Sequence, residues 1–476
     1  MAALAILVSC SKGKDTSYEI SYRVSFEPED HYIDVRMRYV PAKPDGKAVT
    51  FKMPVWAPGY YIIMDYPKYV TGFEAFESSG EPAAWSKSGK NSWVINSSGA
   101  LDIHYKVFAD AVSVADSKVT AEGAFIAPNG VFLYKDIDHP VSVAFTLPDK
   151  WKTISTSLPF GDGVYSAEDF DVLYDSPFLI GDHLTKSIEQ DGIVYEFAVQ
   201  RPEGFEESPI AGDFMAGVRE AVRMFEDTPY ESYHLLLLGR GPGGLEHQSS
   251  QADYTAGHWD FETREAYLSE LRFMTHEYFH CYNVKAIRPI ELGPFDYDKE
   301  VFTPLLWFSE GITCYYESLL LEKAGVETPQ EHLDFLARYI KDTENTEGRK
   351  HMSLRQSSYD IWLNFFNRSA NASATTISYY VKGPVLGFLM DLEIQRISGG
   401  KKSLDDLMSL LYWRFHKEKG RGFTEDEFWA AAEEVAGGGL GQIRRYVDTT
   451  DEIDYDQILT PAGLTLDKET WTLTRN

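Results

Sequence analysis

The sequence predicts an α+β protein of several domains, in which an antiparallel β-sandwich precedes a mixed α+β region and a helical region. Apolar and polar side chains alternate from Ser17 to about Asp182, and turn residues interrupt the alternation every ten or so positions. Apolar stripes with helical spacing begin near Ile210 and dominate the rest of the chain. The length of 476 residues and the hydrophobic content of 43% suffice for two or three hydrophobic cores.

Residues 1–16 are interpreted as a targeting and tethering segment. An apolar run, Ala2–Ser9, ends at Cys10, and this resembles a bacterial lipoprotein signal whose cysteine is acylated. We therefore expect export to the periplasm or cell surface, with a lipid anchor at Cys10 in a bacterial membrane. An ordinary signal peptide or a terminal tail is the alternative. No later run reaches the roughly 18 apolar residues that span a bilayer.

The composition narrows the choice of partners. Acidic side chains number 73 against 45 basic ones, which gives a net charge of −28 and no basic stripe to offset it. This argues against a nucleic-acid partner. The three cysteines are too few for a disulfide framework. Cys281 and Cys314 are interpreted as packed thiols, and a disulfide between them is the alternative.

The predicted β-sandwich covers residues 17–185. Period-two alternation is clearest in Tyr18–Phe26, His31–Tyr39 and Leu101–Phe108, which predicts strands with one buried face. We find no catalytic constellation here, and the region is interpreted as a packing and positioning domain.

The mixed α+β domain is predicted over residues 186–345. Gly192–Val199 has the pattern of a strand, Ile210–Asp227 that of an amphipathic helix, and Tyr233–Leu238 that of a buried strand.

A glycine-rich edge follows that buried strand. Gly243 and Gly244 allow a ligand backbone to approach closely, and they would place Glu246 and His247 on an open edge. The alternative is a turn with solvated polar residues.

The segment with the clearest chemistry has the pattern His-Glu-x-x-His. His276 and His280 are four residues apart and so share one face of a helix, where two imidazoles can hold one Zn²⁺ at roughly 2.0–2.1 Å each. Glu277 is offset from the first coordination shell but can reach a zinc-bound water as a base. The flanking segment is apolar, so these three polar side chains require partners.

A catalytic zinc site needs a third protein ligand and one open position. Thr303–Lys323 has the pattern of a long helix that carries Glu310 and Glu317, seven residues apart and on one face. Periodicity does not choose between the two carboxylates. The neighbours Trp307 and Ile312 favour Glu310 as the buried one.

Residues 346–476 are predicted to be a helical domain. The segments with a helical pattern of apolar residues are Ser357–Phe366, Ser378–Ile397, Leu404–Glu418 and Glu425–Val435. Tyr380 begins the apolar segment, and a tyrosine beside a zinc site can donate its phenolic proton to a developing oxyanion. An aromatic core residue is the alternative interpretation.

Several phrases together resemble the glycyl aminopeptidase family of zinc metallopeptidases, within the gluzincin group that also holds thermolysin. These phrases are Trp56–Tyr60, Gly243–His247, His276–His280 with Asn283–Lys285 and Ile287–Pro289, Pro294–Tyr297, Leu306–Gly311 and Tyr380–Gly383. They occur in family order between about Ser17 and Leu464, and the set is highly specific although single members are weak.

The resemblance implies a β-domain, a thermolysin-like catalytic domain and a helical bundle. It implies one Zn²⁺ per chain held by His276, His280 and Glu310, with Glu277 as the base and later the proton donor to the leaving amine. Tyr380 would be the oxyanion donor. The edge at Gly243, Gly244 and His247 would align the substrate backbone, and Glu246 would pair with the free α-amine.

The substrates expected from this resemblance are peptides with a free N-terminus, cleaved after a small residue such as Gly or Ala. The family commonly ends in a PDZ domain, whereas this sequence stops at Asn476, so PDZ-dependent recruitment or oligomerisation is not carried over. An endopeptidase on the same scaffold is the first alternative function. A non-enzymatic binding protein with a vestigial site is the second.

Overall fold

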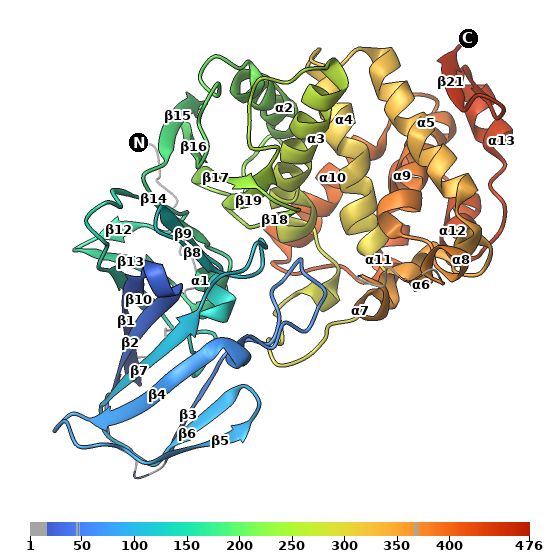
Figure 1. The fold of residues 1–476 in the computed structure, drawn as a ribbon. Helices are drawn as coiled ribbons and strands as arrows, with labels where there is room; N and C mark the ends of the chain where they lie inside the picture. Colours follow the sequence, from blue (N-terminus) through green and yellow to red (C-terminus); the bar gives the residue numbers. More distant parts are fainter. Residues whose placement is uncertain (1–16, 44–45, 47, 366–368, 370) are drawn as a thin grey trace, which may run out of the picture. The chain divides into compact units, whose positions relative to one another are not determined.

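A computed structural model describes residues 17–43, 46, 48–365, 369 and 371–476 (Figure 1). The chain divides into two compact units, of which the first comprises Met1–Ala57 and Met64–Asp182 and the second Pro58–Ile63 and His183–Asn476. The predicted α+β class is confirmed, since several β-sheets come first in the chain and a helical region comes last. The predicted tether with Cys10 lies outside the described residues, so lipidation stays a prediction.

The first unit is built from three sheets. The largest has the strand order β12-β13-β10-β1-β2-β7-β4, the second β11-β14-β9-β8 and the third β3-β6-β5. All pairs in these sheets are antiparallel except β1 with β10, which run parallel. The elements are β1 (Tyr18–Glu27), β2 (Tyr32–Pro41), β3 (Val49–Lys52), β4 (Val70–Glu77), β5 (Trp85–Gly89), β6 (Ser92–Ile95), β7 (Leu101–Phe108), β8 (Lys118–Val119), β9 (Gly123–Ile126), β10 (Val141–Phe145), β11 (Thr153–Ser155), β12 (Phe160–Gly161), β13 (Val164–Ala167), α1 (Phe170–Tyr174) and β14 (Phe178–Gly181).

The alternation read from the sequence places the core of this unit. In β1 every second side chain from Tyr18 to Val24 is buried, and β2 and β7 repeat the pattern. The register sets Val24 opposite Val35 and Val35 opposite Tyr105, so buried side chains of neighbouring strands meet on one face.

The second unit contains a five-stranded sheet with the order β15-β16-β17-β19-β18. Strands β16, β17 and β19 are parallel, and β15 and β18 are antiparallel to their neighbours. Because β18 is the last strand in this order, it is an edge strand. The strands are β15 (Leu184–Gln190), β16 (Ile193–Val199), β17 (Ser232–Arg240), β18 (Gly244–Glu246) and β19 (Ser250–Thr255). A small hairpin, β20 (Leu464–Asp467) and β21 (Thr472–Arg475), lies near the end of the chain.

The helices of this unit share one continuous hydrophobic core with that sheet. Regions predicted as separate catalytic and helical domains therefore lie within a single unit. The helices are α2 (Ile210–Phe225), α3 (Arg264–Phe279), α4 (Ile312–Lys323), α5 (Pro329–Asn345), α6 (Leu354–Tyr359), α7 (Ile361–Asn364), α8 (Ala372–Thr375), α9 (Tyr379–Ile397), α10 (Leu404–Leu411), α11 (Glu425–Ala436), α12 (Gly441–Asp448) and α13 (Tyr455–Leu459).

Capping side chains explain where the principal helices begin. Thr263 accepts a hydrogen bond from a first-turn amide of α3, Ser378 does so for α9, and Thr328 forms a capping box with Glu331 at α5. Gly437 ends α11 with φ of 71°, a left-handed conformation that glycine adopts without strain.

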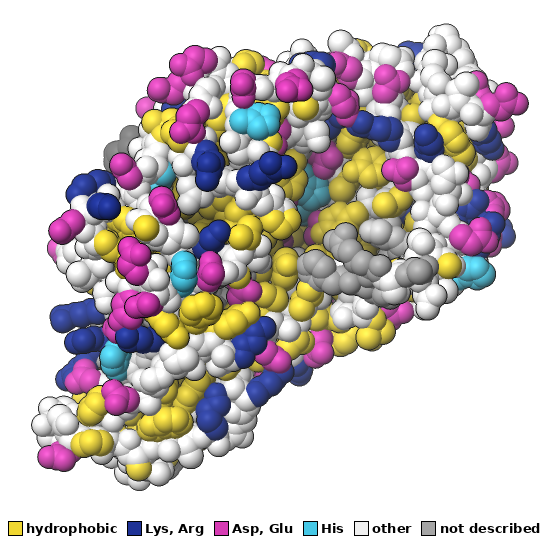
Figure 2. All heavy atoms as spheres, in the orientation of Figure 1, with side chains coloured by type: hydrophobic (Ala, Val, Ile, Leu, Met, Phe, Trp, Pro, Cys, Tyr) yellow, Lys and Arg dark blue, Asp and Glu magenta, His cyan; other side chains and the backbone are white. Residues whose placement is uncertain are grey.

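Two further features concern the charges on the surface and the hydropathy of the helices. Over the face in Figure 2, acidic and basic side chains are interspersed with apolar ones. Of the helices in the described part of the chain, none is long and apolar enough to cross a membrane.

Candidate metal centre

The two histidines of the His-Glu-x-x-His segment lie at the end of α3. His276 is in the last turn, and His280 follows the helix with helical backbone angles, so their rings come to one side. Their Nε2 atoms are 3.1 Å apart, and both side chains are buried. A π-helical turn, Cys281–Ala286, follows directly. The regular α-helical hydrogen bonding is therefore interrupted where the site is built, as is common for π-turns.

Glu310 comes from a second π-helical turn, Trp307–Gly311, which continues into α4. The helix predicted to start at Thr303 therefore starts later, and its first turn is widened. Glu310 Oε2 lies 3.2 Å from His280 Nε2 and 3.5 Å from His276 Nε2. Donors about 2.05 Å from a tetrahedral zinc ion are about 3.3 Å from one another. The triangle of these three atoms has that size.

Hydrogen bonds on the far sides of both rings decide which nitrogen carries a proton. His280 Nδ1 lies 2.6 Å from the backbone oxygen of Asn283, and His276 Nδ1 lies 2.8 Å from Glu317 Oε2. Both partners are acceptors, so each Nδ1 is the donor and each Nε2 keeps its lone pair. The two Nε2 lone pairs then converge with the Glu310 oxygen, which is unfavourable without a cation between them. The donor set therefore fits Zn²⁺.

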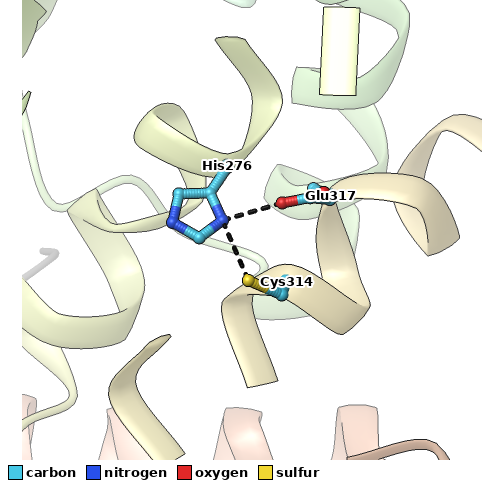
Figure 3. A group of neighbouring side chains, drawn as sticks. All are labelled: His276, Cys314 and Glu317. Carbon is cyan, nitrogen blue, oxygen red and sulfur yellow. Dashed lines mark hydrogen bonds and ion pairs between the residues drawn. The ribbon is translucent and has the colours of Figure 1, made fainter. Parts of the chain in front are cut away.

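Figure 3 shows the group on the far side of His276, where Glu317 of α4 lies beside the ring and Cys314 of α4 lies below it in this view. Cys314 Sγ is 3.7 Å from His276 Nδ1, and burial raises the pKa of this thiol to about 11. It is therefore a neutral thiol. Glu317, which periodicity left as an alternative ligand, instead accepts a hydrogen bond from His276 Nδ1 and orients that ring.

Electrostatics at the centre favours an ionised Glu310. Burial would raise the pKa of its carboxyl, but His280 and His276 lower the pKa to about 2.

Asn283 joins the two segments that carry the three donors. Besides accepting from His280, it donates from Nδ2 to the backbone oxygens of Phe308 and Ser309, each at 3.1 Å, and to Thr313 Oγ1 at 3.2 Å. Asn283 is fully buried and has non-helical backbone angles, φ −113° and ψ 81°. Its place within the π-turn Cys281–Ala286 thus ties His280 to the turn that contains Glu310.

Glu277 lies between the histidines in sequence and against the edge strand in space. A methyl group added at Gly244 would be 2.5 Å from Glu277 Oε1, so the absence of a side chain there makes room for the carboxylate. The predicted close approach at Gly244 thus involves Glu277. Burial raises the pKa of Glu277 well above its ordinary value, and Asp253, Glu246 and Glu310 add to this while His276 opposes it. A carboxyl of this kind can both take and return a proton.

The predicted glycine-rich edge is β18 and its turn. Glu246 is buried, and one carboxylate oxygen, one oxygen of Glu277 and a nitrogen of His280 all lie within 4.8 Å of one another. Gly243 has φ of 80° with open space around it. The backbone N–H of His247 donates to the oxygen of Ser250 at 2.9 Å and closes the turn into β19.

Three tyrosine side chains, Tyr380, Tyr379 and Tyr61, lie near the candidate metal-binding residues. Tyr380 is half-buried in the first turn of α9, with its ring centre 6.5 Å from that of His276. Burial and then Glu310 raise the pKa of Tyr380 well above its ordinary value, so its hydroxyl remains a donor. Tyr379 and Tyr61 are buried and have pKa values raised by burial and by Glu310 in the same way.

Sequence reasoning did not find Asn283, Tyr61 or Tyr379. Asn283 belongs to the motif Asn283–Lys285, to which the sequence assigns no role. Its function depends on contacts with residues 25 to 30 positions away. Tyr61 lies in a segment assigned to the β-sandwich. An asparagine shortly after the His-Glu-x-x-His pattern is the signal in the sequence that could indicate the role of Asn283. Cys281 and Cys314 are both free thiols, so the alternative of a disulfide is not realised.

Two models of known protein families match the chain, one in each of the two units. Residues 21–182 match the peptidase M61 N-terminal domain, and residues 269–386 match the M61 glycyl aminopeptidase domain. These matches are those of a zinc metallopeptidase. Within that class, the chain belongs to the M61 glycyl aminopeptidase family. No curated protein matches the chain by sequence.

Solved structures show the same fold. An aminopeptidase N family protein from Idiomarina loihiensis is 26% identical, with a TM-score of 0.88 over 94% of this chain and 79% of that chain. The M1 zinc metallopeptidase from Deinococcus radiodurans is 14% identical, with a TM-score of 0.56 over 92% and 93%. Aminopeptidase A of Legionella pneumophila, solved with aspartic acid, is 12% identical, with a TM-score of 0.56 over 90% and 49%.

Proposed function

We propose that this protein is a zinc-dependent aminopeptidase that removes small N-terminal residues from peptides, with one Zn²⁺ per chain held by His276, His280 and Glu310. The observation that carries the proposal is the triangle of 3.1, 3.2 and 3.5 Å between two Nε2 lone pairs and one carboxylate oxygen. Bound there, zinc would polarise a scissile carbonyl and lower the pKa of a bound water to about 7.

The roles of the protein's own groups follow from their positions. Glu277 takes a proton from the attacking water and returns it to the leaving amine, and its raised pKa supports both transfers. Tyr380 donates its hydroxyl hydrogen to the oxygen that becomes negative. Glu246 pairs with the protonated α-amine of the substrate, which is a charge-assisted hydrogen bond in a buried place. The edge strand β18 lies where an extended substrate backbone could add to the sheet.

Similar proteins support the exopeptidase form of the proposal. A mutant of the Deinococcus radiodurans metallopeptidase, 13% identical with a TM-score of 0.54, was solved with a Tyr-Ser-Ala substrate. The match to the glycyl aminopeptidase domain supports small first residues.

The proposal is tested by metal analysis together with paired substrates. We expect one zinc per chain, hydrolysis of glycyl and alanyl anilides, and no hydrolysis of their N-acetylated forms. Equal hydrolysis of both forms would contradict the amine-anchoring role of Glu246. Internal cleavage in a peptide library, read by mass spectrometry, would favour the endopeptidase alternative.

The base is tested separately with Glu277→Gln. The variant should keep its zinc and lose at least about 10²-fold in kcat, because an amide cannot accept the proton. Unchanged turnover would exclude Glu277 as the base. Absence of turnover in the unmodified protein with zinc bound would instead favour the vestigial binding protein.

A further inference from the structure

One short segment of the first part of the chain belongs to the second unit. Pro58–Ile63 is grouped with His183–Asn476, although the residues on both sides of it are grouped with the first unit. No catalytic role was assigned to this segment from the sequence. Within the second unit it meets both the substrate edge and the aromatic side chains beyond α6.

Gly59 of this segment lies directly against the carboxylate of Glu246. A methyl group added at Gly59 would be 2.6 Å from Oε1 and 2.8 Å from Oε2 of Glu246, and 2.7 Å from Cδ1 of Leu245. These separations are shorter than van der Waals contact, so Glu246 occupies the space that any side chain at position 59 would need. Gly59 also has φ of +86°, which side-chain-bearing residues rarely adopt.

The rest of the segment is held in place by aromatic packing. The ring centre of Tyr60 is 5.6 Å from that of Phe365, and the ring centre of Tyr61 is 5.7 Å from that of Trp362, in edge-on arrangements. Tyr61 is 3% exposed. The backbone at Gly59 is thus supported from behind by packed rings.

We propose that Gly59 is a positioning residue, whose bare backbone fixes the carboxylate of Glu246 for pairing with the substrate amine. This rests on the proposed aminopeptidase function and adds a residue to it. Both oxygens of the carboxylate lie within 2.8 Å of the place that a methyl group at Gly59 would take, and one of them lies within 4.8 Å of an oxygen of Glu277 and a nitrogen of His280. Any side chain at position 59 moves Glu246 away from the place where the amine binds.

Two small ligands isolate the contribution of the amine. Glycine hydroxamate and acetohydroxamate carry the same zinc-chelating group and differ by one amine. Their dissociation constants are measured by calorimetry on the zinc-loaded full chain. In the unmodified protein we expect glycine hydroxamate to bind at least about tenfold more tightly. In Gly59→Ala this ratio should fall towards one, while the affinity for acetohydroxamate and the zinc content stay unchanged.

Gly192→Ala is the matched control. Gly192 has φ of +82° in the turn between β15 and β16, and nothing lies within 4 Å of an added methyl group. It carries the same backbone strain without the contact, so its ratio should equal that of the unmodified protein. A Gly59→Ala ratio equal to this control would overturn the positioning role alone. A ratio near one in the unmodified protein would overturn the amine anchor and the proposed function with it.

A shorter acid tests the steric cause. Glu246→Asp withdraws the carboxylate by one methylene, so adding Gly59→Ala to it should change the ligand ratio by less than twofold. If Gly59→Ala alone fails to fold, folding of the double variant supports the contact. A double variant that also fails to fold and bind zinc overturns the steric account.

Discussion

The hydrogen bonds behind the two histidines decide how well the centre can hold a metal. His276 is oriented by a buried carboxylate and His280 by a backbone oxygen, and neither partner follows from the spacing of the His-Glu-x-x-His pattern. The pattern predicts two rings on one face because a helix has a fixed pitch. It does not predict their outer partners, because these come from distant segments.

Glu317 can be tested against its neighbour Cys314. Glu317→Gln should lower zinc affinity about 10- to 100-fold, because the charge that holds the Nδ1–H tautomer of His276 is lost. Cys314→Ala should leave zinc affinity within about threefold, because a thiol at 3.7 Å is a weak partner. Zinc competition with a chromogenic chelator measures both. A larger loss in Cys314→Ala than in Glu317→Gln would make the thiol the true partner.

Asn283 allows a second test at this scale. Asn283→Ala removes one donor from each of the buried oxygens of Phe308 and Ser309, which still accept from Ile312 N–H and Thr313 Oγ1, so each lost hydrogen bond costs about 0.5–1.5 kcal/mol. The free energy of unfolding and the zinc affinity should therefore fall together, measured by urea titration and by chelator competition. Asn345→Ala, at an exposed position, should change neither. Zinc affinity equal to that of the unmodified protein would separate Asn283 from the centre.

At the scale of elements, caps and periodicity predict most helices of the second unit, including α2, α9 and α11, to within a few residues. The π-turns were missed because they depend on donors and acceptors that only the packed structure brings together. The helices α12 and α13 and the terminal hairpin were also missed, because short elements have little periodicity. The site elements are then joined by glycine contacts that no pattern predicts.

One such contact joins α9 to the π-turn that contains Glu310. A methyl group at Gly383 would be 2.6 Å from Gly311 Cα and 3.2 Å from the backbone oxygen of Trp307. Gly383→Ala should therefore push α9 outwards and move Tyr380, which is three residues away. We expect kcat to fall at least about tenfold with zinc retained, because the oxyanion donor is displaced.

Gly387, one turn further along α9, provides the control. An added methyl group there would make ordinary contacts of 3.4 Å with Ile312 and Tyr315. Gly387→Ala should keep full activity in the same kinetic assay. Its free energy of unfolding should rise by up to about 1 kcal/mol, because alanine has a higher helix propensity than glycine. Equal kcat for both alanine variants would contradict the claim that the Gly311–Gly383 contact positions Tyr380.

At the scale of the whole molecule, the organisation differs from a linear succession of domains. The alternation of the first part predicts its sheets, yet Pro58–Ile63 is grouped with the second unit. Its membership depends on aromatic packing against Trp362 and Phe365, about 300 residues later in the chain. The part of the chain between α2 and α13 shares one core, so a change in one buried polar network affects the stability of the entire unit.

His332 in α5 belongs to such a network and makes stability depend on pH. It is buried, with Nδ1 2.9 Å from Ser318 Oγ, and Ser318 donates to Glu327, which is paired with Arg272 through two bonds of 2.8 Å. Burial, then Arg272 and Lys323, lower the pKa of His332 from 6.5 to about 4. As the pH falls, the unfolded chain therefore binds this proton first. The contribution to stability is complete above pH 6.5 and is lost as the pH falls from 6.5 towards 4.

His332→Gln removes this titration but keeps a polar partner for Ser318. Between pH 6.5 and 4, the unmodified protein should lose about 3 kcal/mol more of its unfolding free energy than the variant does. Urea unfolding at several pH values, with a chelator present so that metal release adds nothing, measures the difference. His351→Gln, at an exposed position, should follow the unmodified protein throughout. Parallel curves for His332→Gln and the unmodified protein would mean that His332 takes up its proton equally in the folded and unfolded chains.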